Sequence, residues 1–338
     1  MHSKPFSITP EAVLSVENLS VEFPIYKGSV KALNNVNLKI FPGEIVGLVG
    51  ESGSGKSVTA MMSTRLIADE VYHVKHGSIF LRGKDVLNCP ESDMLSIRGR
   101  QVSMIFQEPM TALNPVMRVG KQIVGAILRH QALDKQAAKQ KAIKLLSDME
   151  IADPEQVFNS YPFELSGGMR QRIMIALAFS CEPELLIADE PTTALDVTVQ
   201  KQVLLLLRER ARRTGTAILL ITHDLAVVAQ FCERVYVMYA GSVVEEGLTH
   251  EVIYSPKHPY TQGLLAGLPE KVQSGEELAT IPGQVPNLAQ LPEGCAFMDR
   301  CAWAHGSCYK RPSLLPICVS QTHKTACWKV QQEGGADA

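Results

Sequence analysis

The stretch that most constrains the fold runs from Glu44 to Met62, with the sequence EIVGLVGESGSGKSVTAMM. Ile45 to Val49 is a short apolar run with β-branched residues, which predicts a buried strand. Gly50 to Ser57 then matches the pattern G-x-x-x-x-G-K-[ST], and a helix-compatible segment follows. Glycines in such a loop let backbone N–H groups point inward, and the helix start adds a positive dipole end. The stretch therefore predicts a strand, a phosphate-binding loop and a helix.

Within this loop, we expect Lys56 to reach the β- and γ-phosphates of a nucleotide and the Ser57 hydroxyl to bind Mg²⁺. The alternative is a glycine turn with a chance lysine, which the flanking strand and helix disfavour. The predicted nucleotide-binding residues of the loop are Gly50, Glu51, Ser52, Gly53, Ser54, Gly55, Lys56, Ser57 and Val58.

Two further apolar runs end in polar side chains. Leu185 to Ala188 leads into Asp189 and Glu190, and Ala217 to Ile221 leads into Thr222 and His223. A carboxylate at the end of a buried strand needs a partner, and Mg²⁺ held with the loop serine supplies one. Ligands of parallel sheets bind at the carboxyl ends of the strands, which favours a shared site. The alternatives are an exposed acidic loop for Asp189 and Glu190 and a structural role for His223.

Composition narrows the functional classes. The chain has 338 residues, a formal net charge of −2, 46% hydrophobic and 20% charged residues. It exceeds a domain of about 100–200 residues, so we expect one large domain and one smaller domain. The charge balance gives no global field that favours nucleic acid or anionic lipid. There is no signal-like apolar core near the N-terminus and no run of about 18 apolar residues, which predicts a soluble cytoplasmic protein with reduced thiols.

Together with LSGGMRQR at Leu165 to Arg172, these motifs resemble the ATP-binding-cassette (ABC) family, in the order that the family shows, from about Val13 to Ser255. The resemblance implies an α/β fold of the P-loop NTPase type. Its cassette, residues 1–255, would hold a mostly parallel core sheet, an antiparallel β subdomain and a helical subdomain at about 108–180. It implies an ATPase that uses ATP and Mg²⁺.

The resemblance also assigns roles to residues. It implies Glu190, His223 and Gln107 as catalytic residues, with Mg²⁺ bound at Ser57, Gln107 and Asp189. The signature motif would be Leu165, Ser166, Gly167, Gly168 and Met169, and Ala194 to Asp196 resembles the D-loop, with Asp196 as its acidic residue. Phe23 or Tyr26 would stack on adenine, and plain strand packing is the alternative for either ring.

After Ser255 the sequence becomes rich in Pro and Gly and loses periodicity, which predicts a boundary and an irregular extension over residues 256–338. HPYTQGLL, IPGQVPNLAQLPEGC and DRCAWAHGSC resemble the C-terminal extension of dipeptide and oligopeptide permease ATPases, and Met169 resembles their D-type chain. The resemblance implies an importer of di- or oligopeptides, with nickel, glutathione or antimicrobial peptides as alternative cargoes.

Partners follow from the same resemblance. The signature loop of one cassette closes over the phosphate loop of another, which implies a heterodimer with an F-type ATPase chain. Two transmembrane permease subunits and a periplasmic substrate-binding protein complete the complex, so the chain would be peripheral on the cytoplasmic face of the bacterial inner membrane. A non-transport ABC ATPase that acts on DNA or ribosomes is disfavoured, because the chain has no basic stripe, and no nucleic-acid partner is expected.

Five of the 8 cysteines follow Gly294. The reduced compartment argues against disulfides, and C-x5-C-x6-C is wider than the C-x2–4-C pairs of zinc sites. The resemblance implies a 4Fe-4S cluster with Cys295, Cys301, Cys308 and Cys327 as ligands rather than Cys318. Zinc with His305 or His323, or plain loop cysteines, remain alternatives.

Overall fold

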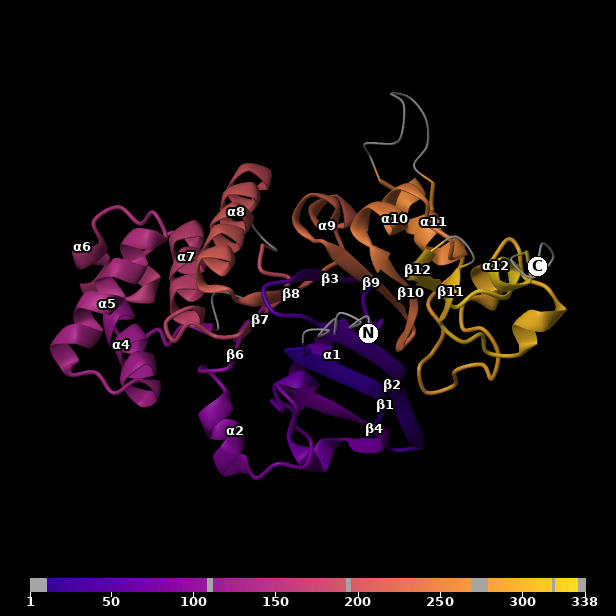
Figure 1. Ribbon diagram of the computed structural model, residues 1–338, viewed down its shortest axis with the longest axis horizontal. Coiled ribbons are helices and arrows are strands. Elements are labelled where there is room, and N and C mark those ends of the chain that lie inside the picture. Colours follow the sequence, from indigo (N-terminus) through magenta and orange to yellow (C-terminus); the bar gives the residue numbers. More distant parts are fainter. Residues whose placement is uncertain (1–10, 108–111, 193–195, 269–278, 318–319, 334–338) are drawn as a thin grey trace, which may run out of the picture.

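The computed structural model describes residues 11–107, 112–192, 196–268, 279–317 and 320–333. Two sheets form the centre of the described chain. The larger sheet has 8 strands in the order β11-β12-β10-β9-β3-β8-β7-β6, and the smaller has 4 strands in the order β2-β1-β4-β5. Figure 1 shows a lobe of helices at one end of the molecule and the C-terminal segment at the other end.

The strands have the following bounds: β1 Leu14–Ile25, β2 Gly28–Ile40, β3 Ile45–Val49, β4 His73–Leu81, β5 Lys84–Asp85, β6 Val102–Ile105, β7 Leu185–Asp189, β8 Ala217–Thr222, β9 Arg234–Tyr239, β10 Ser242–Leu248, β11 Leu315–Ile317 and β12 Ser320–Thr325. The α-helices are α1 Lys56–Ser63, α2 Glu91–Ile97, α4 Val119–His130, α5 Lys135–Asp148, α6 Pro154–Asn159, α7 Gly167–Ala178, α8 Val197–Thr214, α9 Leu225–Phe231, α10 Thr249–Tyr254, α11 Pro259–Ala266 and α12 Trp328–Glu333. Short 3₁₀ turns are η1 Asp69–Val71, η2 Pro162–Glu164, η4 Met298–Arg300 and η5 Gly306–Tyr309.

The parallel core forms as the apolar runs predict. β3 pairs in parallel with β8 and β9, and β7 pairs in parallel with β8 and β6. Every residue of β3, β7 and β8 is buried. Because both faces of these strands are covered, they read as continuous apolar runs rather than alternating ones. The carboxyl ends of these five parallel strands lie at one edge of the sheet, which brings the polar residues after them together.

The cassette also contains the two predicted subdomains. β1 pairs antiparallel with β2 and β4 in the smaller sheet. Helices α4 to α7 form the lobe at the magenta end of Figure 1. Buried side chains at helical spacing, such as Ile123 and Ile127 of α4 with Leu145 and Leu146 of α5, join the main core cluster. The ABC-type α/β cassette is therefore confirmed as the fold.

The C-terminal segment is more ordered than the predicted irregular extension. It contributes β11, β12 and α12, and β12 pairs antiparallel with β10 in the register Glu245↔Thr325. Without β12, β10 would present unpaired N–H and C=O groups at the sheet edge. The strands were missed because β11 has 3 residues and β12 has 6, too short for a clear period. In the part of the chain that the structure describes, no helix has the length and apolar character needed to cross a membrane.

Candidate nucleotide-binding site

The phosphate loop needs glycine at its two ends for steric reasons. Gly50 has φ 154° and Gly55 has φ 103°, values that side chains rarely adopt. A Cβ on Gly50 would lie 2.2 Å from the carbonyl oxygen of Met238, and one on Gly55 would lie 2.9 Å from that of Ala32. The loop is thus pressed against β9 and β2, and it ends as the N-cap of α1.

Lys56 opens α1 and is buried. Its Nζ donates to the carbonyl oxygens of Gly50 at 2.8 Å and Glu51 at 3.0 Å, so the ammonium folds back over the loop. Burial lowers the pKa of Lys56, whereas the carboxylates of Glu190, Asp189 and Glu51 oppose that shift. The loop therefore presents a positive charge next to backbone N–H groups, as a polyphosphate requires.

The other predicted loop residues differ in exposure. Ser52 and Gly53 are exposed, and Gly53 has φ 77°. Ser54 is buried, and its Oγ has no hydrogen-bond partner among the described residues. Ser57 and Val58 are half-buried on the first turn of α1, where Val58 packs on the core.

Asp189 ends β7 beside the loop and is 6% exposed. Burial raises its pKa, and a hydrogen bond from the Ser57 side chain lowers it. Its Oδ1 is buried without a partner in the described chain. A serine hydroxyl beside a carboxylate with an unsatisfied oxygen is the donor set that Mg²⁺ takes in phosphate sites. The residues present therefore fit the metal.

The three predicted catalytic residues lie in direct contact. Nε2 of Gln107, just after β6, donates to Oε2 of Glu190 at 2.9 Å. Nδ1 of His223, just after β8, lies 3.1 Å from Oε1 of the same carboxylate. Glu190 has φ 46°, an unfavourable conformation for a non-glycine residue, which its neighbours and its N–H bond to Ile221 stabilise. The ends of three adjacent strands thus converge on one carboxylate.

The signature residues begin helix α7. The Ser166 side chain accepts a hydrogen bond from the N–H of Met169 at 3.3 Å as the N-cap, and Leu165 before it is buried. Ser166 and Gly167 are exposed. A Cβ on Gly167 would have nothing within 4 Å, and one on Gly168 would lie 3.5 Å from Val199. No neighbour in the described part of the chain therefore requires glycine at 167.

The predicted D-loop is described only at Asp196, which caps α8 by accepting from the N–H of Val199 at 3.0 Å; Ala194 and Leu195 lie outside the described residues. The sequence analysis missed Gln171, which is fully buried in α7 and donates to the carbonyl oxygen of Pro191 after Glu190. The signature helix and the acidic strand end are thereby joined directly.

The two candidate adenine-stacking rings have different surroundings. Tyr26 is 99% exposed in the turn between β1 and β2. Phe23 is half-buried on β1, with its ring centroid 6.4 Å from that of Tyr72. Phe23 thus packs within the strand layer, as the alternative to adenine stacking predicted. The ring of Tyr26 packs on none of the described residues.

Two residues that the sequence analysis did not assign reach the loop from the C-terminal segment. The N–H of Glu51 donates to Oη of Tyr260 at 2.7 Å. The guanidinium of Arg300 bridges both carboxylate oxygens of Glu51 at 2.7 and 3.1 Å. Their separations in sequence, 209 and 249 residues, leave no local pattern that could have revealed them.

Comparison with known proteins identifies the family. Residues 33–193 match the family described as ABC transporter, and residues 244–308 match the oligopeptide/dipeptide transporter C-terminal region. The probable D,D-dipeptide transport ATP-binding protein DdpD of Escherichia coli is 57% identical over 96% of this chain and 98% of its own. The oligopeptide transport ATP-binding protein OppD of Bacillus subtilis is 46% identical over 94% of this chain and 88% of its own.

The chain belongs to the ABC transporter family. It is an ATP-hydrolysing member of that family, as its motifs predicted. Among solved structures, the dimeric post-hydrolysis state of the ATP-binding cassette MJ0796 bound to ADP and phosphate has a TM-score of 0.62 and 26% identity, over 70% of this chain and 98% of that one. The cbiO1 structure from Clostridium perfringens also has a TM-score of 0.62, at 26% identity, over 72% and 92% of the two chains.

Outside the cassette motifs, the C-terminal segment of this ABC protein gathers four cysteines. Cys295, Cys301, Cys308 and Cys327 line one small cavity of about 20 Å³, room for about one water molecule, and His305 lies beside them. Burial raises the pKa of Cys295 to about 11. In the described chain, however, no three His, Cys, Asp or Glu side chains are arranged to hold a single metal ion. Cys318 lies outside the described residues.

The histidines proposed as alternative zinc ligands are separated by the fold. Nδ1 of His305 lies 3.7 Å from Sγ of Cys308, and its Nε2 is buried with no partner among the described residues. His323 is directed instead at Glu245, with 2.7 Å between Nε2 and Oε1. His323 therefore belongs to the β10–β12 contact and not to the cysteine cavity.

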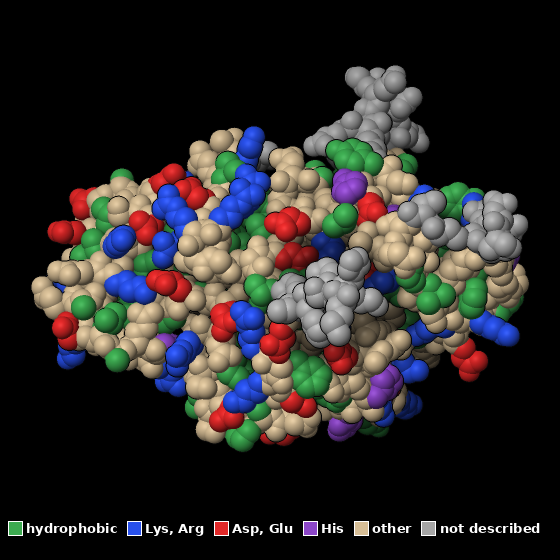
Figure 2. All heavy atoms as spheres, viewed as in Figure 1, with side chains coloured by type: hydrophobic (Ala, Val, Ile, Leu, Met, Phe, Trp, Pro, Cys, Tyr) green, Lys and Arg blue, Asp and Glu red, His purple; other side chains and the backbone are tan. Residues whose placement is uncertain are grey.

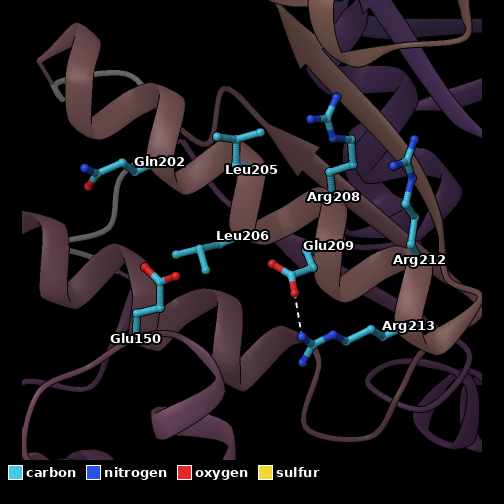
Figure 3. Close-up of a pocket in the computed structure, with 8 residues that line it drawn as sticks. All are labelled: Glu150, Gln202, Leu205, Leu206, Arg208, Glu209, Arg212 and Arg213. Carbon is cyan, nitrogen blue, oxygen red and sulfur yellow. Dashed lines mark hydrogen bonds and ion pairs between the residues drawn. The ribbon is translucent and has the colours of Figure 1, made fainter.

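A larger hollow on the surface of this ABC protein is lined by none of the predicted site residues. It has a volume of about 610 Å³ along α8, and Figure 3 shows its lining: Glu150, Gln202, Leu205, Leu206, Arg208, Glu209, Arg212 and Arg213. Arg213 donates to Glu209 one turn earlier at 2.5 Å. On the face drawn in Figure 2, Lys and Arg side chains are interspersed with Asp and Glu side chains.

Proposed function

We propose that the chain is the ATPase subunit of a bacterial ABC importer for di- or oligopeptides. The ATPase role rests on one observation: Gln107 and His223 both contact the Glu190 carboxylate. This contact lies at the same edge of the sheet as Asp189 and the phosphate loop with Lys56. The match of residues 244–308 to the oligopeptide/dipeptide transporter C-terminal region supports a peptide cargo. So do the names of the relatives, which are peptide-transport proteins in several bacteria.

The residues divide the reaction among them. Backbone N–H groups of the loop and Lys56 hold the phosphates. Ser57 and Asp189 would hold Mg²⁺, which would neutralise charge on the phosphates. Glu190 accepts a proton from the attacking water as general base. Gln107 and His223 hold the Glu190 carboxylate in place, and the side-chain oxygen of Gln107 would be a further ligand of Mg²⁺. Tyr26 or Phe23 stacks on the adenine.

The signature motif acts on a second cassette. Ser166 and Gly167 are exposed at the start of α7, and none of the described residues occupies the space over Gly167. A helix start with exposed N–H groups suits the γ-phosphate of a partner subunit. We propose that this partner is a different, F-type ATPase chain. ATP closes the pair, and hydrolysis releases it.

Assembly with membrane subunits would determine where the chain is located in the cell and what its two segments do. Two permease subunits, met by the helical lobe near residues 108–180, would hold the chain on the cytoplasmic face of the inner membrane, with a substrate-binding protein outside. Residues 1–255 act as the cassette and 256–338 as the extension. Nickel, glutathione and antimicrobial peptides are the alternative cargoes. A non-transport ABC ATPase is disfavoured by the interspersed charges of the face drawn in Figure 2.

Transport by the whole complex tests this function. The chain is co-expressed with the permease and binding-protein genes beside its own, in a strain without peptide importers. We expect one complex that contains a second, distinct ATPase chain and imports labelled dipeptides. Glu190→Gln should keep the complex and slow ATP hydrolysis roughly 100-fold or more. A chain that purifies without membrane subunits would contradict the importer role, and uptake of Ni²⁺ without peptides would contradict the cargo.

We further propose that the cysteine cavity holds a 4Fe-4S cluster. Four cysteine thiolates are the ligand set of such clusters, and the chain brings Cys295, Cys301, Cys308 and Cys327 to one cavity. In the described residues no three His, Cys, Asp or Glu side chains are placed to hold one metal ion, and the cavity has a volume of about 20 Å³, so either a cluster or a zinc ion requires the thiols to move from this arrangement. Measurement of iron and sulfide in the purified protein tests the proposal.

A further inference from the structure

The second residue of the phosphate loop, Glu51, is held from three directions. Its N–H donates to Oη of Tyr260 at 2.7 Å, and its carboxylate receives the two bonds from Arg300. Its carbonyl oxygen accepts from Nζ of Lys56 at 3.0 Å. One residue of the cassette thus connects the C-terminal segment to the lysine that is to hold the phosphates.

Arg300 is itself fixed by its surroundings. Its side chain is 6% exposed, its Nε donates to the carbonyl oxygen of Pro282 at 2.9 Å, and Nη1 lies 3.3 Å from Oη of Tyr239. The guanidinium lies 5.8 Å from the ring centroid of Tyr239 and 5.9 Å from that of Phe297. An arginine with this many partners has few other rotamers, so it transmits the position of η4 to Glu51.

The ion pair also has an electrostatic consequence for a bound polyphosphate. Glu51 is an acidic residue within a loop whose function is to attract anions. The bidentate contact with Arg300 neutralises this carboxylate at the site. The Arg300 side chain is 6% exposed and that of Glu51 is 29% exposed, so water and salt screen the pair less than they would a fully exposed one. Without Arg300, a negative charge would stand beside the phosphates.

We propose that Arg300 and Tyr260 are positioning residues of the nucleotide site, which orient Glu51 and through it Lys56 and which remove the charge of Glu51. The C-terminal segment thereby sets the affinity of the cassette for ATP. The proposal rests on the proposed ATPase function, because the loop must bind nucleotide for its orientation to matter.

Calorimetric titration of the purified full chain with Mg-ATP tests this proposal. We expect Arg300→Ala to raise the Kd about tenfold, which corresponds to one charge-assisted contact. Arg300→Lys should raise it less, because lysine keeps the charge and loses the bidentate geometry. The double variant Arg300→Ala with Glu51→Gln should recover most of the affinity, which a purely structural role of Arg300 would not produce. Tyr260→Phe removes only the acceptor of the Glu51 N–H and should raise the Kd a few-fold.

Lys324→Ala is the matched control. Lys324 makes an ion pair from the C-terminal segment to Glu246 of β10 and does not contact the loop. Its loss should leave the Kd unchanged. If Arg300→Ala binds Mg-ATP within about twofold of wild type, or if Glu51→Gln restores nothing, the proposal is wrong while the ATPase function stands. Should Arg300→Ala fail to fold in a melting experiment, Arg300→Lys and Tyr260→Phe decide the question. A wild-type chain that binds no Mg-ATP would overturn the proposed function as well.

Discussion

At the scale of single residues, the nucleotide site holds a carboxylate that folding alone disfavours. Asp189 ends a fully buried strand, and its Oδ1 has no partner in the described chain. Burial raises its pKa above the ordinary value of 3.8, so the folded state holds the proton more tightly than the unfolded state does. Stability from this group therefore falls as pH rises above that ordinary value. The charge of Asp189 therefore disfavours folding, and its place in the site is explained by the proposed binding of Mg²⁺.

Replacement of Asp189 by asparagine removes this charge and keeps the shape. Without nucleotide at pH 7, we expect Asp189→Asn to melt about 2 °C above wild type, the shift for roughly 1 kcal/mol in a chain of this size. Near pH 3 the difference should vanish, because the carboxyl group is then protonated in both states. Mg²⁺ should no longer strengthen ATP binding. Calorimetric melting at the two pH values measures the first effect.

Glu190→Gln is the control for that measurement. Glu190 follows Asp189, but its carboxylate has protein partners in Gln107 and His223. Its replacement removes a charge from the same strand end without relieving an unsatisfied buried oxygen, so the gain in melting temperature should be smaller. An Asp189→Asn variant that melts below wild type at pH 7 would show that the buried charge is already compensated within the chain.

At the scale of elements, one buried carboxylate joins the C-terminal strand to the cassette. Glu245 of β10 is fully buried. It accepts from the backbone N–H groups of Lys257 at 2.6 Å and His258 at 3.0 Å, and its Oε1 lies 2.7 Å from Nε2 of His323 on β12. Burial lowers the pKa of His258 to about 4, which keeps that ring neutral. Its Nδ1 therefore accepts a hydrogen bond from the backbone N–H of Tyr260 and caps α11. The Glu245 carboxylate of β10 therefore connects the cap of α11 and strand β12 through hydrogen bonds.

Replacement of Glu245 by alanine should destabilise the protein more than replacement of the adjacent Glu246. We expect Glu245→Ala to lower the free energy of unfolding by about 3 kcal/mol or more, because it leaves buried donors without an acceptor. Glu246 is also buried, but its partner Lys324 is 37% exposed and can be replaced by water, so Glu246→Ala should cost less than Glu245→Ala. Urea unfolding curves of both variants provide the comparison. Equal losses in the free energy of unfolding for the two variants would show that the buried hydrogen bonds of Glu245 do not stabilise the protein more than the ion pair of Glu246 does.

At the scale of the whole molecule, the C-terminal segment closes over the cassette at several separate places. β12 extends the main sheet beside β10, and the N–H of Lys31 on β2 donates to the carbonyl oxygen of Leu288 at 3.0 Å. Tyr260 and Phe297 join the main core cluster. Cys295 and Cys327 line the same cavity from opposite ends of the Cys-rich stretch. A ligand shared by these thiols would therefore tie the segment into one unit.

Removal of one ligand tests the proposed cluster. In protein purified without oxygen, we expect iron and sulfide in equal amounts, close to the content of one 4Fe-4S cluster per chain. Cys295→Ser should lose most of this iron and melt at a lower temperature. Cys89→Ser, a change outside the cavity, should retain both. A wild-type protein that is folded, colourless and free of iron would rule the cluster out, and stoichiometric zinc would favour the zinc alternative.

Much of the site could be predicted because its parts are local motifs placed at strand ends. Lys56, Asp189 and His223 each follow an apolar run, and parallel pairing of those runs brings their ends together without further information. The partial order of the C-terminal segment could not be predicted, because β11 and β12 are short and gain their stability from β10 rather than from their own composition. The same holds for His323, whose partner Glu245 lies 78 residues away.

The sequence by itself therefore determined the family, the parallel core and the polar residues that meet at the strand ends, since periodicity and motif order are properties of neighbouring residues. Only the tertiary structure decided what surrounds the phosphate loop. Tyr260 and Arg300 reach Glu51 across 209 and 249 residues, and no short pattern encodes such a contact. Packing of β12 on β10 and of Phe297 on the core brings them there. The physical reason is that long-range pairing depends on how whole elements pack, whereas a motif depends only on the chain within it.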